Sequence, residues 1–277
     1  MRFRKIYVEI SNLCNLSCRF CPGTKRTPGR MSTEEFSSLL PKLRPYSDFL
    51  YFHVMGEPLC HPQLECFLSL AGQAAFKVIL TTNGTLLAKH QEMLLSHPAL
   101  HKVNISLHAF EANDLPVSFE HYLDDCFAFG KAASGKKLVV FRLWNRGGAD
   151  ELNHDILARM KLHFPSPWVE EPRGTRIDQR VYLEYGEKFD WPDMDAREGT
   201  ARLRCLGLRD QIGVLWDGTV IPCCLDHEGD LALGNLFQDD LETILSSPRA
   251  KAIHEGFLRS EAVEPLCRRC GYARRFQ

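Results

Sequence analysis

Three cysteines near the start of the chain have a spacing that could bind a metal. Cys14, Cys18 and Cys21 lie within the stretch EISNLCNLSCRFCPG and are spaced Cys-x3-Cys-x2-Cys. A structural zinc site uses four protein ligands, whereas three thiolates leave one iron of a [4Fe–4S] cluster open to another molecule. The spacing therefore indicates an iron–sulfur cluster. It could instead belong to a zinc site completed by a distant His or Cys, or to three unrelated buried thiols.

A second set of cysteines lies in the last third of the chain: Cys205, Cys223, Cys224, Cys267 and Cys270. The stretch IGVLWDGTVIPCC (212–224) predicts a hairpin with Asp-Gly at its turn. A hairpin and a distant Cys-x2-Cys can bring four thiolates around one metal centre. A zinc ribbon is the alternative to a second iron–sulfur cluster, and spacing cannot distinguish Cys223 from Cys224.

The elements that must position these cysteines alternate between strand and helix. Strand-like runs occupy residues 5–10, 48–54, 76–84, 102–108 and 136–145. Helix-like stretches occupy residues 32–43, 62–73, 89–97, 118–134 and 150–164. Five such pairs in succession predict an α/β fold with parallel strands and helical crossovers. The pattern fits a doubly wound sheet or a partial barrel, and in both the functional groups collect at the carboxyl ends of the strands.

The alternating pattern ends near residue 165. Residues 165–176 are rich in proline and charge and predict a connector, and residues 186–205 have no clear periodicity. A helix-like stretch at 238–257 follows the expected hairpin. We therefore expect two domains: a barrel over 1–175, and a connector with a small hairpin-plus-helix unit over 176–277.

Composition limits the possible classes of protein. The chain has 277 residues and a net charge of −1, which argues against a nucleic-acid binder or a membrane-surface protein. The first residues, MRFRKIYVEIS, lack an apolar signal core, and no apolar run approaches the ~20 residues of a membrane span. We expect a cytoplasmic protein, in which eleven cysteines indicate metal binding or catalysis and not disulfides.

Four motifs in order carry a resemblance to a known family. CNLSCRFC resembles the Cys-x3-Cys-x-aromatic-Cys signature of the radical S-adenosylmethionine (radical SAM) superfamily. HVMGEPLCHP resembles its Gly-Glu-Pro motif, LTTNGTLL its Thr-Asn-Gly strand end, and VNISLHA its fourth-strand segment. Each lies at a predicted strand end within residues 6–145. The resemblance implies a partial (β/α)6 TIM-like barrel.

The resemblance also implies roles for single residues. The implied ligands of a [4Fe–4S] cluster that carries S-adenosylmethionine (SAM) are Cys14, Cys18 and Cys21. Phe20 would lie near the adenine, Gly56 and Glu57 would hold the methionine amino group, and Ser106 would contact the ribose or carboxylate. Many relatives have an arginine shortly after this serine, but this chain has none. Arg142 is the nearest candidate by position, and it could equally be structural.

The carboxy-terminal third resembles the extensions of radical SAM enzymes called SPASM and twitch. The full SPASM pattern has three more cysteines after its Cys-x2-Cys, and this sequence stops at Gln277, so the twitch form fits better. The implied ligands of an auxiliary [4Fe–4S] cluster are Cys205, Cys223, Cys267 and Cys270, with Cys224 as the alternative to Cys223.

The implied reaction is the reductive cleavage of SAM to a 5′-deoxyadenosyl radical, which abstracts a hydrogen atom from the substrate. A fully ligated auxiliary cluster would then accept an electron, so the net reaction would be an oxidation. The substrate would be a small molecule or a ribosomally made peptide. The barrel begins at residue 6, with no leader-peptide domain before it, so we favour a small molecule, or a peptide enzyme with a separate recognition protein. An external one-electron reductant such as flavodoxin or ferredoxin is expected.

A function without catalysis is also compatible with the cysteines. The chain could be a zinc-binding interaction protein, which would contain zinc and no iron. No catalytic base is assigned, since histidines such as His53 and His108 are more often structural than catalytic. Five arginines could meet an anionic substrate, although a solvated face is the commoner explanation: Arg142, Arg146, Arg173, Arg176 and Arg180.

Overall fold

One curved and mostly parallel sheet forms the centre of the molecule. The computed structural model describes residues 2–172 and 174–276. Within these ranges eleven strands pair in the order β11-β10-β9-β1-β2-β3-β4-β5-β8-β7-β6. The strands are β1 (Lys5–Val8), β2 (Phe49–Phe52), β3 (Lys77–Thr82), β4 (Leu100–Ser106), β5 (Leu138–Arg146), β6 (Val169–Glu171), β7 (Gly174–Asp178), β8 (Val181–Glu187), β9 (Gln211–Val214), β10 (Thr219–Ile221) and β11 (Gly234–Asn235).

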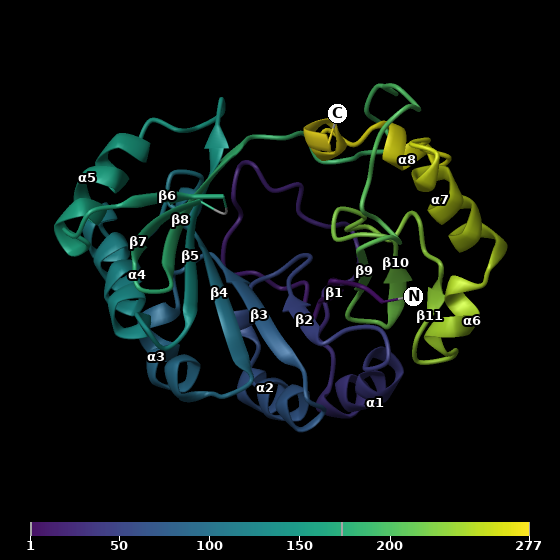
Figure 1. Cartoon of the computed structure of the whole chain (residues 1–277), viewed down its shortest axis with the longest axis horizontal. Coiled ribbons are helices and arrows are strands. Elements are labelled where there is room, and N and C mark those ends of the chain that lie inside the picture. Colours follow the sequence, from purple (N-terminus) through teal and green to yellow (C-terminus); the bar gives the residue numbers. More distant parts are fainter. Residues whose placement is uncertain (1, 173, 277) are drawn as a thin grey trace.

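Helices α1 to α5 lie along the outer side of this sheet (Figure 1). The α-helices are α1 (Thr33–Leu43), α2 (Leu64–Gln73), α3 (Leu87–Ser96), α4 (Phe119–Ala133), α5 (Asn153–His163), α6 (Leu241–Leu245), α7 (Pro248–Leu258) and α8 (Pro265–Arg268). Short 3₁₀ helices are η1 (Pro58–Cys60), η2 (Leu107–Ala109) and η3 (Tyr272–Phe276). None of the helices in the described ranges combines the length and the apolar character needed to cross a bilayer.

The five predicted strand–helix pairs are confirmed. Strands β1 to β5 are neighbours in chain order and pair in parallel, and each is followed by its helix. A doubly wound sheet needs helices on both faces, whereas here the first five helices share one side, so the fold is a partial barrel. Parallel pairing brings the carboxyl ends of all these strands to one edge, where the loops that follow them meet.

Local sequence signals explain why the helices begin where they do. Ser32 caps α1, since its hydroxyl accepts from the Glu35 N–H while the Glu35 carboxylate accepts from the Ser32 N–H at 2.7 Å, as the predicted capping box requires. Phe36, Leu39 and Leu43 then recur at helical spacing and are fully buried against the sheet. Burial of such side chains contributes roughly 1.5–3 kcal/mol each.

The segment after α5 differs from the expectation of a connector. β6 and β7 form an antiparallel hairpin, and β8 pairs with β7 and, in parallel, with β5. β8 is thus a sixth parallel strand, and no helix lies between it and β9 in this part of the chain, all of which the structure describes. Val181 and Leu183 are fully buried, whereas Tyr182 and Glu184 are only partly buried. This alternation was not recognised as a strand because proline and charged residues lie nearby.

The carboxy-terminal hairpin continues the barrel sheet. β9 and β10 pair antiparallel around a turn at Asp217-Gly218, as predicted, and Gly218 has φ +84°. β9 also pairs in parallel with β1, which joins the two ends of the chain. The expected boundary at 175/176 falls inside β7. The helix expected at 238–257 is divided into α6 and α7, because Ser247 caps a new helix that has Pro248 at its first position.

Candidate active site

The first cysteine set lies in the loop that follows β1, at the carboxyl edge of the sheet. Hydrogen-bond donors surround its sulfurs: the Leu16 N–H points to Cys14 Sγ at 3.4 Å, and the Asn113 side-chain amide points to Cys18 Sγ at 3.1 Å. Asn83, which follows β3, lies 3.9 Å from Cys14 Sγ. Such donors stabilise thiolates and tune a bound cluster. The loops after three strands therefore converge on these thiols.

These thiols need a positive partner to ionise. Burial raises the pKa of Cys14 to about 11, with smaller contributions from the charges of Glu57 and Cys18. Burial likewise raises the pKa of Cys18 and of Cys21, and the charge of Cys21 adds to the effect on Cys18. A bound metal supplies the compensating charge. The soft donor set is the one that iron–sulfur clusters use.

The arrangement of the ligands also bears on the kind of metal centre. Zinc needs its ligands to converge on one point at about 2.3 Å, whereas a cubane distributes its thiolates over separate irons. In the ranges that the structure describes, no group of three or more His, Cys, Asp or Glu side chains is placed to hold a metal ion.

Glu57 and Gly56 hold loops together beside the first cysteine set. Both carboxylate oxygens of Glu57 accept from backbone N–H groups, one from Leu59 at 3.0 Å and one from Asn83 at 2.7 Å. Glu57 is buried, and burial raises its pKa to about 7. Gly56 has φ +77°, and a Cβ there would lie 2.4 Å from the carbonyl oxygen of Ser11. Their expected contact with an amino group stays a prediction.

A cavity of about 360 Å³ occupies the inside of the barrel. Three residues predicted for SAM binding line it, namely Phe20, Ser106 and Arg142, whereas Gly56 and Glu57 lie outside its lining. Phe20 packs against His108 with ring centroids 4.9 Å apart. Ser106 and Arg142 are paired across β4 and β5, which places both at the same level of the sheet. The structure thus brings these three predicted residues together.

Arg142 is held in place within this cavity. Its Nε lies 3.1 Å from a Glu184 carboxylate oxygen, and its guanidinium lies 4.7 Å from the centre of the Trp144 ring. The remaining four arginines fall elsewhere or outside the described residues. Arg146 lies over the Tyr185 ring, Arg176 pairs with a glutamate in β6, Arg180 is exposed, and Arg173 lies outside the described residues.

Two histidines line the same cavity as neutral imidazoles. Burial lowers the pKa of His53 to about 4, with help from the charges of Arg142 and Lys5. Burial also lowers the pKa of His108 to about 4, and its Nδ1 lies 3.2 Å from the carbonyl oxygen of Arg142. A neutral imidazole can accept a proton. Both histidines are therefore placed where they could receive one from a bound molecule.

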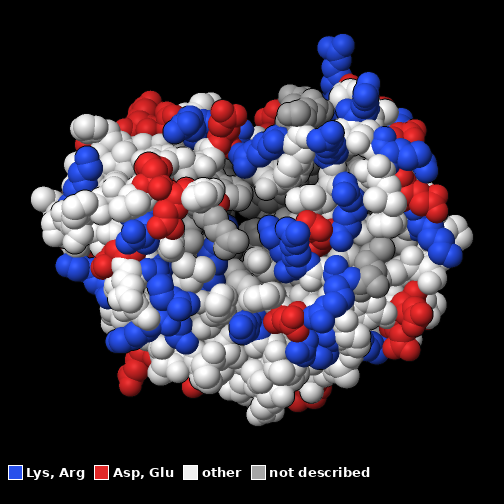
Figure 2. Space-filling view, viewed as in Figure 1, with Lys and Arg blue, Asp and Glu red and all other residues white. Residues whose placement is uncertain are grey.

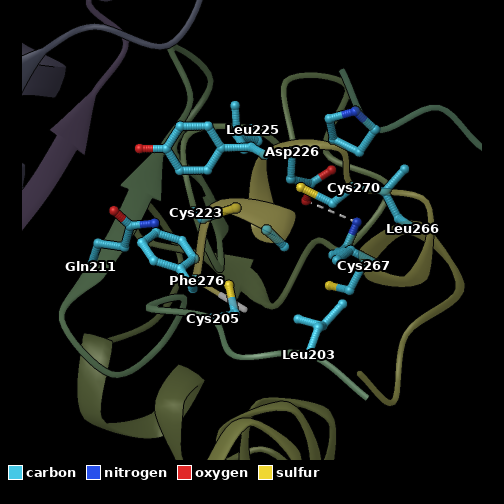
Figure 3. A pocket seen from close by; sticks show the side chains of 14 residues that line it. Leu203, Cys205, Gln211, Cys223, Leu225, Asp226, Leu266, Cys267, Cys270 and Phe276 are labelled. Carbon is cyan, nitrogen blue, oxygen red and sulfur yellow. Dashed lines mark hydrogen bonds between the residues drawn. The ribbon is translucent and has the colours of Figure 1, made fainter. Parts of the chain in front are cut away.

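The second cysteine set lines a separate pocket. Figure 3 shows this pocket with the side chains of Cys205, Cys223, Cys267 and Cys270 around it. Burial raises the pKa of each thiol, and the neighbouring cysteines raise it further at Cys223 and Cys267. Cys224 does not line this pocket. It lines the barrel cavity instead, where the Tyr7 hydroxyl is hydrogen-bonded to it.

Sequence reasoning missed one acidic residue of this pocket. Asp226 is buried, and one carboxylate oxygen accepts from the Leu231 N–H at 3.0 Å (Figure 3). Its other oxygen has no partner in the described part of the chain, and burial raises its pKa to about 7. None of the motifs used to predict the cluster ligands includes Asp226. Lys5 and Tyr7 were missed too, although their alternation with Ile6 and Val8 in β1 indicated an inward face.

The fold and the two thiol sites define a class of protein: a partial β/α barrel with a three-cysteine loop after its first strand and a four-cysteine pocket beyond the barrel. Residues 8–126 match the model of the radical SAM superfamily. Residues 205–271 match the iron–sulfur cluster-binding domain SPASM. The chain thus contains a radical SAM domain and a SPASM iron–sulfur domain, and it is an enzyme whose cofactors are a [4Fe–4S] cluster with SAM and an auxiliary iron–sulfur cluster.

Several known proteins are similar to more than half of the chain. The S-adenosyl-L-methionine-dependent 2-deoxy-scyllo-inosamine dehydrogenase of Niallia circulans is 26% identical over 59% of this chain and 68% of that protein. The antilisterial bacteriocin subtilosin biosynthesis protein AlbA of Bacillus subtilis is 24% identical over 87% of this chain and 59% of that protein. Among solved structures, BtrN in complex with AdoMet and 2-DOIA has a TM-score of 0.64 at 19% identity, covering 98% of this chain and 94% of BtrN, so it shares the fold.

Proposed function

We propose that the enzyme oxidises its substrate by two electrons and that the second cysteine set holds the electron acceptor. One observation carries the proposal: the four-cysteine pocket and the barrel cavity share the residues Gln211, Leu225 and Tyr272 as part of their linings. A centre held by Cys205, Cys223, Cys267 and Cys270 would have no open position for a substrate, but it would lie beside one. Electron transfer is the role that this arrangement favours.

The first cysteine set would hold the other cluster. Cys14, Cys18 and Cys21 supply three thiolates to it, and Asn113 and the Leu16 N–H supply hydrogen bonds to their sulfurs. When bound, this cluster and SAM supply a 5′-deoxyadenosyl radical that abstracts a hydrogen atom. Phe20, Ser106 and Arg142 would orient SAM at the carboxyl edge of the sheet.

Oxidation of an alcohol also releases a proton, which a residue of the cavity must receive. His53 and His108 are neutral there, because burial lowers the pKa of each to about 4. Either imidazole could accept the substrate proton, but only transiently, because the lowered pKa makes it a weak base. Aromatic side chains that line the cavity would limit the access of water to the reacting atoms, namely Tyr51, Trp144 and Trp191.

The size of the cavity favours a small molecule as the substrate. At about 360 Å³, it falls in the range of sites that enclose ligands of moderate size. The likeness to a dehydrogenase acting on 2-deoxy-scyllo-inosamine supports the same class. The second candidate is maturation of a ribosomally made peptide, which the likeness to AlbA over 87% of this chain favours. The family matches argue against a non-catalytic zinc-binding protein.

An external one-electron donor completes the proposed system. Figure 2 shows Lys and Arg side chains, interspersed with Asp and Glu, beside the hollowed centre of one face, and the basic groups could meet an acidic reductant such as flavodoxin or ferredoxin. We also propose a cytoplasmic location, because eleven unpaired thiols and reduced clusters require a reducing compartment.

Reconstitution without oxygen tests the proposal. The protein is incubated with SAM, dithionite and panels of small alcohols and of precursor peptides, and products are analysed by mass spectrometry. The proposal expects 5′-deoxyadenosine together with a product about 2 Da lighter than a small alcohol substrate. A product of unchanged mass would contradict the net oxidation, and a modified peptide would favour the second candidate.

A further inference from the structure

The barrel cavity has an unbalanced charge. The basic residues that line it are Lys5, Arg19, Arg142 and Lys188, and no aspartate or glutamate of the described residues belongs to its lining. Two of these groups have partners, since Arg142 pairs with Glu184 and Arg19 donates to the carbonyl oxygen of Glu111. Positive charge in a partly enclosed cavity attracts anions and repels cations.

Lys5 differs from these arginines because no carboxylate of the described residues lies within ion-pair distance of its Nζ. The Nζ atom lies over the ring of Tyr51, 5.8 Å from the ring centre. The Lys5 side chain lines the cavity, as do Tyr51, His53 and Gln211. Partial burial of an ammonium group costs free energy when no opposite charge is nearby. A bound anion would supply that charge and accept hydrogen bonds from the ammonium group.

Lys5 also lies far from the place expected for SAM. It is the first residue of β1, where it pairs with Gln211 of β9, whereas the cysteine loop follows the other end of β1. Three residues of strand separate Lys5 from Val8, or about 10 Å. The deep end of the cavity around Lys5, Tyr51 and Gln211 therefore remains for another molecule when SAM occupies the carboxyl edge.

We infer that Lys5 binds an anionic group of the substrate, a carboxylate or a phosphate, at the deep end of the barrel cavity. The inference rests on the proposed function, because it takes this cavity as the substrate site. Lys5 supplies the charge, and the Gln211 amide and the Tyr51 hydroxyl can donate further hydrogen bonds. A substrate that carries an ammonium group there would meet repulsion from Lys5 and Arg142.

Binding of simple anions tests the inference without turnover. Reconstituted protein with SAM is titrated by anaerobic calorimetry at low salt with succinate, with inorganic phosphate and with glycerol as an uncharged probe. The tighter of the two anions identifies the chemistry of the group. We expect Lys5→Gln to weaken that anion about tenfold or more and Lys5→Arg to retain it within about threefold.

Arg4→Gln is the matched control, because Arg4 precedes Lys5 in the chain but its side chain is 84% exposed. It should leave binding unchanged. Equal binding by wild type and Lys5→Gln, an equal loss in Arg4→Gln, or no anion binding by wild type would each overturn the inference.

Lysine labelling covers the case in which Lys5→Gln does not fold. Reductive methylation of the wild-type protein, followed by mass spectrometry, should modify Lys5 more slowly in the presence of the bound anion. An unchanged rate at Lys5 would contradict the inference. Neither assay requires SAM cleavage, so failure to form 5′-deoxyadenosine would count against the proposed function alone.

Discussion

Cys223 and Cys224 are adjacent in the chain, but their thiols lie in different cavities. Cys223 lines the pocket with three other cysteines, and Cys224 lines the barrel cavity beside Tyr7. Strand β10 ends at Ile221, and the backbone bends at Cys223 and turns at Cys224, which lets one Cys-Cys pair serve two sites. Spacing in the sequence could not separate these thiols, and the structure favours Cys223 as the ligand.

Iron content should separate the two cysteines. Wild-type protein with two cubane clusters holds about eight irons per chain. We predict that Cys223→Ala retains about four irons and that Cys224→Ala retains about eight, as measured by iron analysis and electron paramagnetic resonance after reconstitution. The reverse pattern would assign Cys224 as the ligand and would contradict this account of the pocket.

Glu57 should stabilise the folded chain through its two backbone hydrogen bonds. Replacing it with alanine leaves the buried N–H groups of Leu59 and Asn83 without their acceptor, so Glu57→Ala should reduce the free energy of unfolding by about 2–4 kcal/mol. Urea unfolding of the metal-free chain measures this. Glu65→Ala, on the exposed face of α2, should change it by about 0.5 kcal/mol or less. Equal effects of the two variants would show that Glu57 does not hold these loops.

His53 should make stability depend on pH in a defined direction. Burial lowers its pKa from 6.5 to about 4, so between these values the unfolded chain binds a proton that folded His53 does not. Stability contributed by His53 is therefore complete above about pH 6.5 and is lost as the pH falls toward 4. Between pH 7 and pH 5, wild type should lose on the order of 1–2 kcal/mol relative to His53→Gln.

The control for this pH effect is His121→Gln, because the His121 side chain is 66% exposed. Urea unfolding at pH 5, 6 and 7 should give a nearly constant difference between this variant and wild type. A constant difference for His53→Gln as well would mean that His53 is not held neutral by the cavity.

Much of the fold could be predicted because its signals are local. The capping box at Ser32, the apolar strands and the Asp-Gly turn each fix one element, and five strand–helix pairs fix a parallel sheet. β6 to β8 were not predicted, since proline and charged residues dominate that stretch. Their pairing depends on β5, which is distant in the sequence. The division of 238–257 into two helices depends on Ser247-Pro248, a local signal that was available.

The sequence motifs indicated which cysteines form the candidate site, but they did not indicate most of the residues that surround these cysteines. Phe20, Ser106 and Arg142 line the cavity, and their contacts with SAM stay predictions. Lys5 also lines it, because strand β1 turns that residue inward. The backbone N–H groups that donate to the Glu57 carboxylate come from the loops after β2 and β3. Such contacts between distant loops cannot be predicted from a sequence motif. Asp226 is likewise defined by burial, which only the folded chain reveals.

The central claim is that Cys14, Cys18 and Cys21 hold a cluster that cleaves SAM. The most direct measurement is the yield of 5′-deoxyadenosine after the reconstituted protein is incubated without oxygen with SAM and dithionite. We predict that wild type forms it and that Cys14→Ala forms none. Cys66→Ala, which removes an exposed thiol on α2, should match wild type. Zinc in place of iron, or equal yields from wild type and Cys14→Ala, would contradict the claim.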